Sequence, residues 1–94
     1  MFVWDVRKPQ VNYDKHGVAF EEAATVFADP AGLDWADPGH SREEWRCKRL
    51  GRSVAGRILL IVYAVRRMMP HGNETIRIIS ARQASRKERK AYAG

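Results

Sequence analysis

The chain has 94 residues, with 17 lysines and arginines, 11 acidic residues and a formal net charge of +6. A chain of this length forms one small domain with a modest core, which we expect to span residues 1–94. Its single cysteine, Cys47, excludes an intramolecular disulfide. The N-terminus lacks the charged start and long apolar stretch of a secretory signal, so we expect a cytoplasmic protein.

Charge is distributed unevenly along the chain. Residues 1–41 hold three basic and seven acidic residues, a net charge of −4, whereas residues 42–94 hold fourteen basic and four acidic ones, a net charge of +10. This asymmetry predicts an anionic partner for the second half, and nucleic acid is the commonest such partner. The alternative is a protein whose lysines and arginines simply cover its solvated faces.

The N-terminal segment predicts a short edge strand followed by a helix. Residues 2–4 form an aromatic and β-branched run that is typical of a strand. Asp5 is placed to cap the helix that follows, and Gly17 is a stop signal for it. Lys15 and His16 in the last turn suit the negative end of the helix dipole.

A second helix follows, with its apolar residues on one face. Residues at i, i+3, i+4 and i+7 are apolar, namely Phe20, Ala23, Ala24 and Phe27. We expect these side chains to belong to the core. The Asp-Pro pair at 29–30 ends the helix, and residues 38–41 carry a turn signal.

The strands are predicted mainly in the second half. Residues 33–37 alternate weakly, residues 45–50 alternate apolar with basic, and residues 57–65 form the longest apolar run, too short for a membrane helix. A loop at 66–73 joins that run to a second β-prone run at 75–81, which predicts an antiparallel hairpin. The expected fold class is α+β, with about four antiparallel strands, two N-terminal helices and one C-terminal helix.

The C-terminal helix is predicted over residues 85–92. Ser85 and Glu88 have the spacing of a capping box. The helix is crowded with basic residues, namely Arg86, Lys87, Arg89 and Lys90.

Several kinds of chemistry are not supported by the residues. His16, His40 and His71 are scattered singly, and one cysteine cannot build a zinc site, so we expect no metal and no cofactor. No glycine-rich phosphate loop is present, and no serine or cysteine nucleophile has a motif around it. RNA cleavage or nucleic-acid binding by cationic side chains remains.

RNA cleavage needs a base, an acid and cations around the phosphate. Histidine suits the proton transfers near neutral pH, and the guanidinium fork of arginine suits the charge. The possible proton carriers are Lys15, His16, Tyr63 and Tyr92, and the possible clamps are Arg49, Arg52, Arg57, Arg77 and Arg82. For each arginine the alternative is an ordinary surface role, and for His16 it is a capping or core role.

Taken in order, short stretches along the whole chain resemble the BrnT toxins of type II toxin–antitoxin modules. The matching stretches are Trp4-Asp5, Lys15-His16-Gly17-Val18, Phe20-Glu21-Glu22-Ala23, Asp29-Pro30, Asp37-Pro38 with His40-Ser41, Gly51-Arg52-Ser53, and Ile76 to Arg82 with Arg86, Glu88, Arg89 and Tyr92. The resemblance implies a compact relative of the RelE-type ribonucleases, with an antiparallel sheet flanked by helices.

The resemblance also implies an activity, partners and site residues. The activity is metal-independent RNA cleavage that inhibits translation. The partner is a BrnA-like ribbon-helix-helix antitoxin, which neutralises the toxin and through which the pair binds operator DNA. The catalytic candidates that match its motif positions are Lys15, His16, Arg52, Arg77 and Arg82. From their charge, the residues expected to bind RNA are Arg49, Arg57, Arg86, Lys87, Arg89 and Lys90.

Two other functions stay open from the residues alone. One is a non-catalytic RNA- or DNA-binding module, which would show salt-dependent binding and no cleavage products. The other is a partner-binding protein without affinity for nucleic acid. Growth arrest on expression in a bacterium would favour the active toxin over both.

Overall fold

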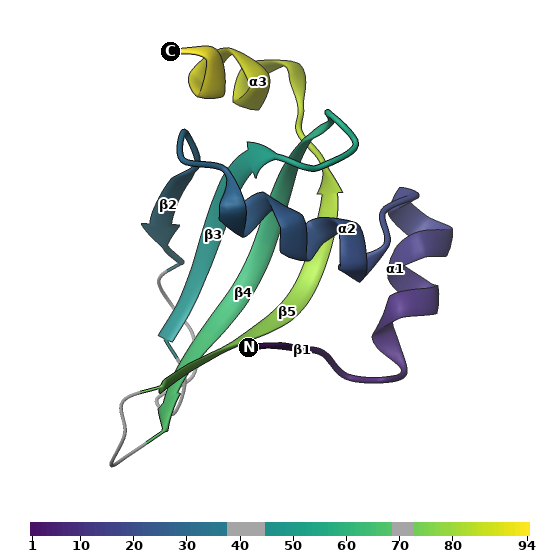
Figure 1. Cartoon of the computed structure of the whole chain (residues 1–94). Coiled ribbons are helices and arrows are strands. Elements are labelled where there is room, and N and C mark those ends of the chain that lie inside the picture. Colours follow the sequence, from purple (N-terminus) through teal and green to yellow (C-terminus); the bar gives the residue numbers. More distant parts are fainter. Residues whose placement is uncertain (38–44, 69–72) are drawn as a thin grey trace.

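The computed structural model describes residues 1–37, 45–68 and 73–94 (Figure 1). The turn predicted at 38–41 and the tip of the hairpin loop at 69–72 therefore lie outside the described residues. The elements in order are β1 (Phe2–Val3), α1 (Lys8–His16), α2 (Phe20–Thr25), the 3-10 turn η1 (Val26–Ala28), β2 (Leu33–Ala36), β3 (Trp45–Arg52), β4 (Ile58–Met68), β5 (Asn73–Gln83) and α3 (Arg86–Ala93).

The described strands form one sheet in the order β1-β5-β4-β3-β2. The predicted α+β class is confirmed, and so is the predicted hairpin, which β4 and β5 form. This hairpin lies in the middle of the sheet. The expectation of about four antiparallel strands differs in detail, because the sheet has five strands and β1 runs parallel to β5. A two-residue strand carries no sequence pattern that distinguishes parallel from antiparallel pairing.

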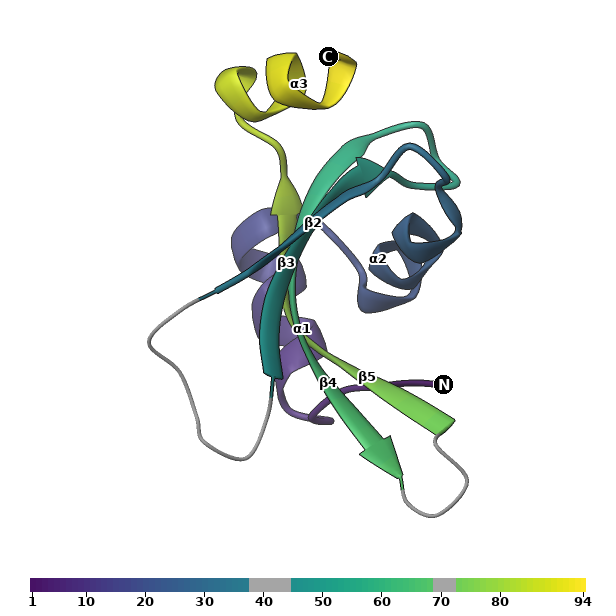
Figure 2. The ribbon, with the colours of Figure 1, turned by 90° about the vertical axis from the view of Figure 1, so that its left-hand side faces the viewer.

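The main core lies between the sheet and α2, which crosses one sheet face (Figures 1 and 2). Phe20 of α2 is fully buried there against Ile61 and Ile78 of the central hairpin. Burial of each such side chain contributes roughly 1.5–3 kcal/mol. The predicted apolar face of the second helix is confirmed, and Val26 of η1 is a further buried core residue.

Helix α1 covers the edge of β5 instead of a sheet face. Its one buried side chain is Asn12, which donates to the backbone oxygens of Val18 and Ala81 at 2.9 Å each. The Asn12 oxygen accepts the Ala81 N–H at 3.1 Å. Strand β1 pairs with β5 only as far as Arg77, so Asn12 satisfies backbone groups that β1 does not reach. Gly17 ends α1 as predicted, at φ 68°.

Helix α3 packs at one end of the sheet (Figure 1). A second, smaller core of Leu50, Leu60 and Ala84 lies beneath it, with Ile58 and Tyr92 partly buried at its margin. The predicted capping box is confirmed, since Ser85 accepts the Glu88 N–H and Glu88 accepts the Ser85 N–H. In the described part of the chain, no helix is long and apolar enough to span a membrane.

Candidate functional site

The sheet has a basic face on the side opposite α2. Cys47 and Tyr63 point into the core beneath α2, so their neighbours along β3 and β4 point the other way. Residues directly opposite each other on paired strands share a face, which extends the assignment across the sheet. The basic residues of this face are Arg46, Lys48, Arg52, Arg66, Arg77 and Arg82. Among the described strand residues, the carboxylates Asp34 and Glu74 alternate onto the α2 side.

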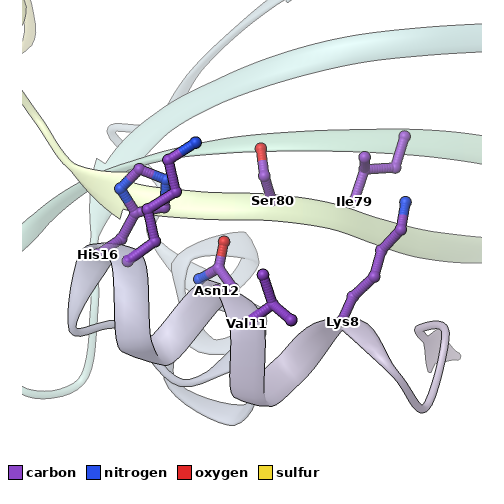
Figure 3. A pocket seen from close by; sticks show the side chains of 7 residues that line it. Lys8, Val11, Asn12, His16, Ile79 and Ser80 are labelled. Carbon is purple, nitrogen blue, oxygen red and sulfur yellow. The ribbon is translucent and has the colours of Figure 1, made fainter.

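A hollow of about 230 Å³ lies where α1 meets β5. It is lined by Lys8, Val11, Asn12, Lys15, His16, Ile79 and Ser80. Figure 3 shows His16 and Lys8 at opposite ends of the helix, with Val11 and Asn12 between them. The register shift opposite Val62 leaves Ile79 without a direct partner on β4, so Ile79 and Ser80 both line the hollow. The hollow thus combines cationic groups with a partly apolar floor.

Lys15 and His16, which are adjacent in the sequence, both line this hollow, at the edge of the strand that carries Arg77 and Arg82. Arg77 and Arg82 share the basic face, but five residues of strand at about 3.3 Å each separate them by roughly 17 Å. Arg52 is across β4 from Arg82, near the same end of the sheet. These three arginines can therefore contact successive phosphates more readily than a single one.

Arg82 and Arg52 already have protein partners. Arg82 donates to both carboxylate oxygens of Glu88, at 2.8 and 2.9 Å. The Arg82 bond lowers the pKa of Glu88 to about 2. The Arg52 guanidinium lies 5.7 Å from the centre of the Tyr92 ring and donates to the Gly56 oxygen at 3.1 Å. Both arginines hold α3 and the adjoining turn in place as well as facing solvent in part.

Arg49 and Arg57, which were expected to bind RNA, lie on the α2 side of the sheet. Arg57 donates to the Glu22 carboxylate, with its Nε 3.0 Å from the oxygen, and this bond lowers the pKa of Glu22. Arg49 pairs with Asp34 and donates to the Val26 oxygen at 3.1 Å. These contacts fasten α2 and η1 to the sheet and link β3 to the edge strand β2, so the geometry gives both arginines a structural role.

The two tyrosines named as possible proton carriers are engaged elsewhere. The Tyr63 hydroxyl is buried and donates to Asp34 at 2.7 Å, and burial raises its pKa strongly. The Tyr92 hydroxyl donates to Asp29 at 2.6 Å, which raises its pKa. Neither group is suited to exchange protons near neutral pH. Lys15 and His16 remain as candidates on geometry.

The four basic residues of α3 are exposed, beyond the end of the basic face. Arg89 donates to the Ala84 oxygen at 2.8 Å, which ties that side chain to the start of the helix. Arg86, Lys87 and Lys90 lie on the solvent side of α3, at the end of the sheet shown in Figure 1. They can extend the positive surface but do not reach the hollow at α1.

Sequence reasoning missed three cations of the basic face, Arg46, Lys48 and Arg66. The signal was present for the first two, because residues 45–50 alternate and place every second residue on one face. Arg66 falls in the loop that the sequence predicts at 66–73, but the structure places it in β4. Across residues 1–37, 45–68 and 73–94, no group of three or more His, Cys, Asp or Glu side chains is arranged to hold a metal ion.

A small domain with a single sheet, one helix-covered face and one basic face is of a class suited to bind nucleic acid. The chain belongs to the BrnT family, the ribonuclease toxins of type II toxin–antitoxin systems, whose family profile matches residues 4–88.

A solved structure supports the fold. The chain is similar to the crystal structure of the Brucella abortus ribonuclease toxin BrnT, with a TM-score of 0.62 and 24% sequence identity. The match covers 92% of this chain and 99% of that one. At this identity the likeness establishes the common fold alone. A search of curated proteins gives no match.

Proposed function

We propose that this toxin is a RelE-like endoribonuclease that holds single-stranded RNA on the basic face and cleaves it at the hollow between α1 and β5. The observation that carries the proposal is the position of Lys15 and His16 in that hollow, beside the strand that bears Arg77 and Arg82. The family supports a ribonuclease role.

The proposed reaction is transfer of the phosphodiester to the neighbouring 2′-hydroxyl. The 2′-oxygen attacks phosphorus, the bond from phosphorus to the 5′-oxygen breaks, and the products carry a 2′,3′-cyclic phosphate and a 5′-hydroxyl. His16 exchanges the proton with the attacking or leaving oxygen, and Lys15 stabilises the charge on the pentavalent phosphorane. Water and protein groups supply the second proton transfer.

The arginines of the basic face bind the RNA backbone in this proposal. Arg82 follows Ala81, whose backbone binds Asn12 of the hollow. In this proposal Arg82 contacts the phosphate next to the cleaved bond, while Arg52 and Arg77 contact phosphates further along. Arg86, Lys87, Arg89 and Lys90 extend the track over α3. Each phosphate contact to a single strand makes the slope of log K against log salt concentration more negative by about 0.7.

The family supports a proposal for the biological setting. Cleavage of RNA by the free toxin would inhibit translation in the cytoplasm. A BrnA-like antitoxin with a ribbon-helix-helix domain would neutralise it, and operator DNA would be bound only through the complex. The positive surface favours an acidic antitoxin segment.

A digest of end-labelled single-stranded RNA in EDTA tests the proposal. Wild-type protein should release fragments that end in 2′,3′-cyclic phosphate, and His16→Ala and Lys15→Ala should each cut at least about a hundredfold more slowly. Arg7→Ala is the matched control, because Arg7 is exposed and lies outside the site. Cleavage by the His16 and Lys15 variants at the wild-type rate would remove the hollow from the reaction.

The extent of the basic face also favours a second candidate, a module that binds RNA without cleaving it. Its cations spread across β3, β4 and β5, as a backbone track requires, and are not gathered around one phosphate. Salt-dependent binding by the wild-type protein without any cleavage product would establish this function instead.

A further inference from the structure

We propose that Trp35 stacks on an unpaired base of the bound RNA and so makes the toxin select single strands. This inference rests on the proposed function, since it deepens the description of how the basic face binds its substrate. Aromatic side chains next to a cationic track are the usual way for proteins to hold single-stranded nucleic acid.

The position of Trp35 follows from its neighbours on β2. Asp34 points to the α2 side, where it accepts from Tyr63 at 2.7 Å and pairs with Arg49. Because side chains alternate along a strand, Trp35 points to the basic face. Its direct partner in the register is Lys48, so the two side chains leave neighbouring positions on that face.

The Trp35 side chain is accessible. The residue is 43% exposed, on the outermost strand of the sheet (Figure 2). Leu33, two residues earlier on the same face, is 42% exposed and is paired with Leu50. Leu33 and Trp35 therefore form an apolar strip next to the cations of this face. A base can stack on this strip while its phosphate lies near Lys48.

The strip lies at a useful distance from the proposed cleavage site. Three strand spacings of about 4.8 Å separate β2 from β5, so Trp35 lies roughly 14 Å from the strand that carries Arg77 and Arg82. A single strand crossing the sheet can reach both. The cations of β3 and β4 lie between them, namely Arg46, Lys48 and Arg66.

The charge of the surface around Trp35 favours RNA over a protein as the partner that binds there. The strand carboxylates Asp34 and Glu74 are on the other face. Asp37 follows β2 opposite Arg46 and shares the face of Trp35, but the cations Arg46, Lys48 and Arg66 outnumber it there. A duplex would present its bases only to one another, and so could not use the indole.

A fluorescence titration tests the inference. The probe is a single-stranded 2′-O-methyl oligonucleotide, which lacks the attacking hydroxyl and is not cleaved, so binding is measured apart from catalysis. Wild-type indole emission should be quenched, and Trp35→Ala should lose the quenching and bind roughly tenfold more weakly. Trp35→Phe should keep most of the affinity, and a duplex of the same sequence should respond little to either change.

Trp45 is the matched control. It is 67% exposed on the neighbouring strand, but it alternates with Arg46 onto the α2 side. Trp45→Phe retains Trp35 and should keep the quenching, which preserves the test if Trp35→Ala does not fold. Unchanged binding by Trp35→Ala, loss of quenching in Trp45→Phe, or no binding by wild type would each overturn the inference.

The same experiment separates the two proposals. If wild-type protein quenches with the oligonucleotide but leaves ordinary RNA intact, the stacking stands and the cleavage proposal fails. If RNA is cleaved in EDTA while Trp35→Ala binds and cleaves as wild type does, the cleavage proposal stands and Trp35 belongs to another surface.

Discussion

The Arg82 guanidinium and the Glu88 carboxylate form a two-pronged ion pair, with N–O distances of 2.8 and 2.9 Å. The pair joins the end of β5 to the first turn of α3, and the same carboxylate accepts the Ser85 N–H at 2.8 Å. Arg82 is thus both a candidate phosphate ligand and a support for α3. Loss of activity in an Arg82 variant does not by itself distinguish these roles.

Paired variants separate the two roles of Arg82. Arg82→Ala and Glu88→Ala both break the ion pair, and each should lower stability by about 1 kcal/mol, or the Tm by roughly 4–8 °C. If Arg82 also binds phosphate, only Arg82→Ala should lose most RNA cleavage. Thermal melts and digests on both proteins check this, and equal loss of cleavage in the two variants would assign Arg82 to support alone.

Stability should fall at acid pH in a window set by Glu88. The pKa of Glu88 is lowered from 4.5 to about 2 in the folded protein, chiefly by the bond from Arg82. Stability from this group is therefore present above about pH 4.5 and is lost as the pH falls toward 2. Glu22 and Asp29 act in the same direction, since hydrogen bonds also lower their pKa values.

Thermal melts from pH 6 to pH 2 measure this loss. The Glu88→Gln variant cannot titrate at this position, so its Tm should fall less steeply than that of wild type across the window. A parallel decline of the two proteins would contradict the assignment to Glu88.

Asn12→Ala should be among the most destabilising single changes in α1. The change leaves the buried N–H and oxygen of Ala81 without their side-chain partner, at about 1–3 kcal/mol for each unsatisfied group. It should also loosen the helix that carries Lys15 and His16, so RNA cleavage should fall with stability. Chemical denaturation and digests measure both effects.

Gln10→Ala is the control for that change. Gln10 donates to Asp14 at 2.8 Å on the exposed side of the same helix, so its loss should cost less than about 0.5 kcal/mol. Similar destabilisation by both variants would show that Asn12 does not anchor α1.

Arg57→Ala should affect mainly the stability of the fold, whereas Lys48→Ala should affect mainly RNA binding. Arg57 is bound to Glu22 beneath α2, so its removal should destabilise by about 1–3 kcal/mol and leave the salt slope of RNA binding unchanged. Lys48 is on the basic face, so its removal should leave the Tm nearly unchanged and make the salt slope of RNA binding shallower by about 0.7. Binding titrations at several salt concentrations distinguish them, and a reduced slope for Arg57→Ala would place RNA on the α2 side.

Periodicity and capping signals predicted most of the fold. The spacing of Phe20 and its apolar neighbours predicted the face of α2 that is buried, and Ser85 with Glu88 predicted the start of α3. The parallel pairing of β1 and the role of Asn12 could not be predicted. Both depend on which backbone groups of β5 are left unpaired, and that is decided only when the sheet assembles.

The candidate site was predictable only in part. The chemistry of their side chains and their positions in the BrnT-like motif make Lys15 and His16 candidates, and the structure places both at one hollow. A list of arginines did not reveal which face each one occupies, and Arg49 and Arg57 differ from Arg52 in this respect. An arginine that binds a carboxylate of the same protein has the same sequence signature as an unpaired one when that partner is distant in the chain, as Glu22 is from Arg57.

Charge reversal at Lys48 shows whether RNA crosses the basic face during cleavage. The measurement is the single-turnover rate of RNA cleavage in EDTA for Lys48→Glu and for Arg7→Glu, which change the net charge equally. Lys48→Glu should cleave at least about tenfold more slowly than wild type, while Arg7→Glu should cleave at the wild-type rate. Equal rates for the two variants would show that RNA does not cross this face.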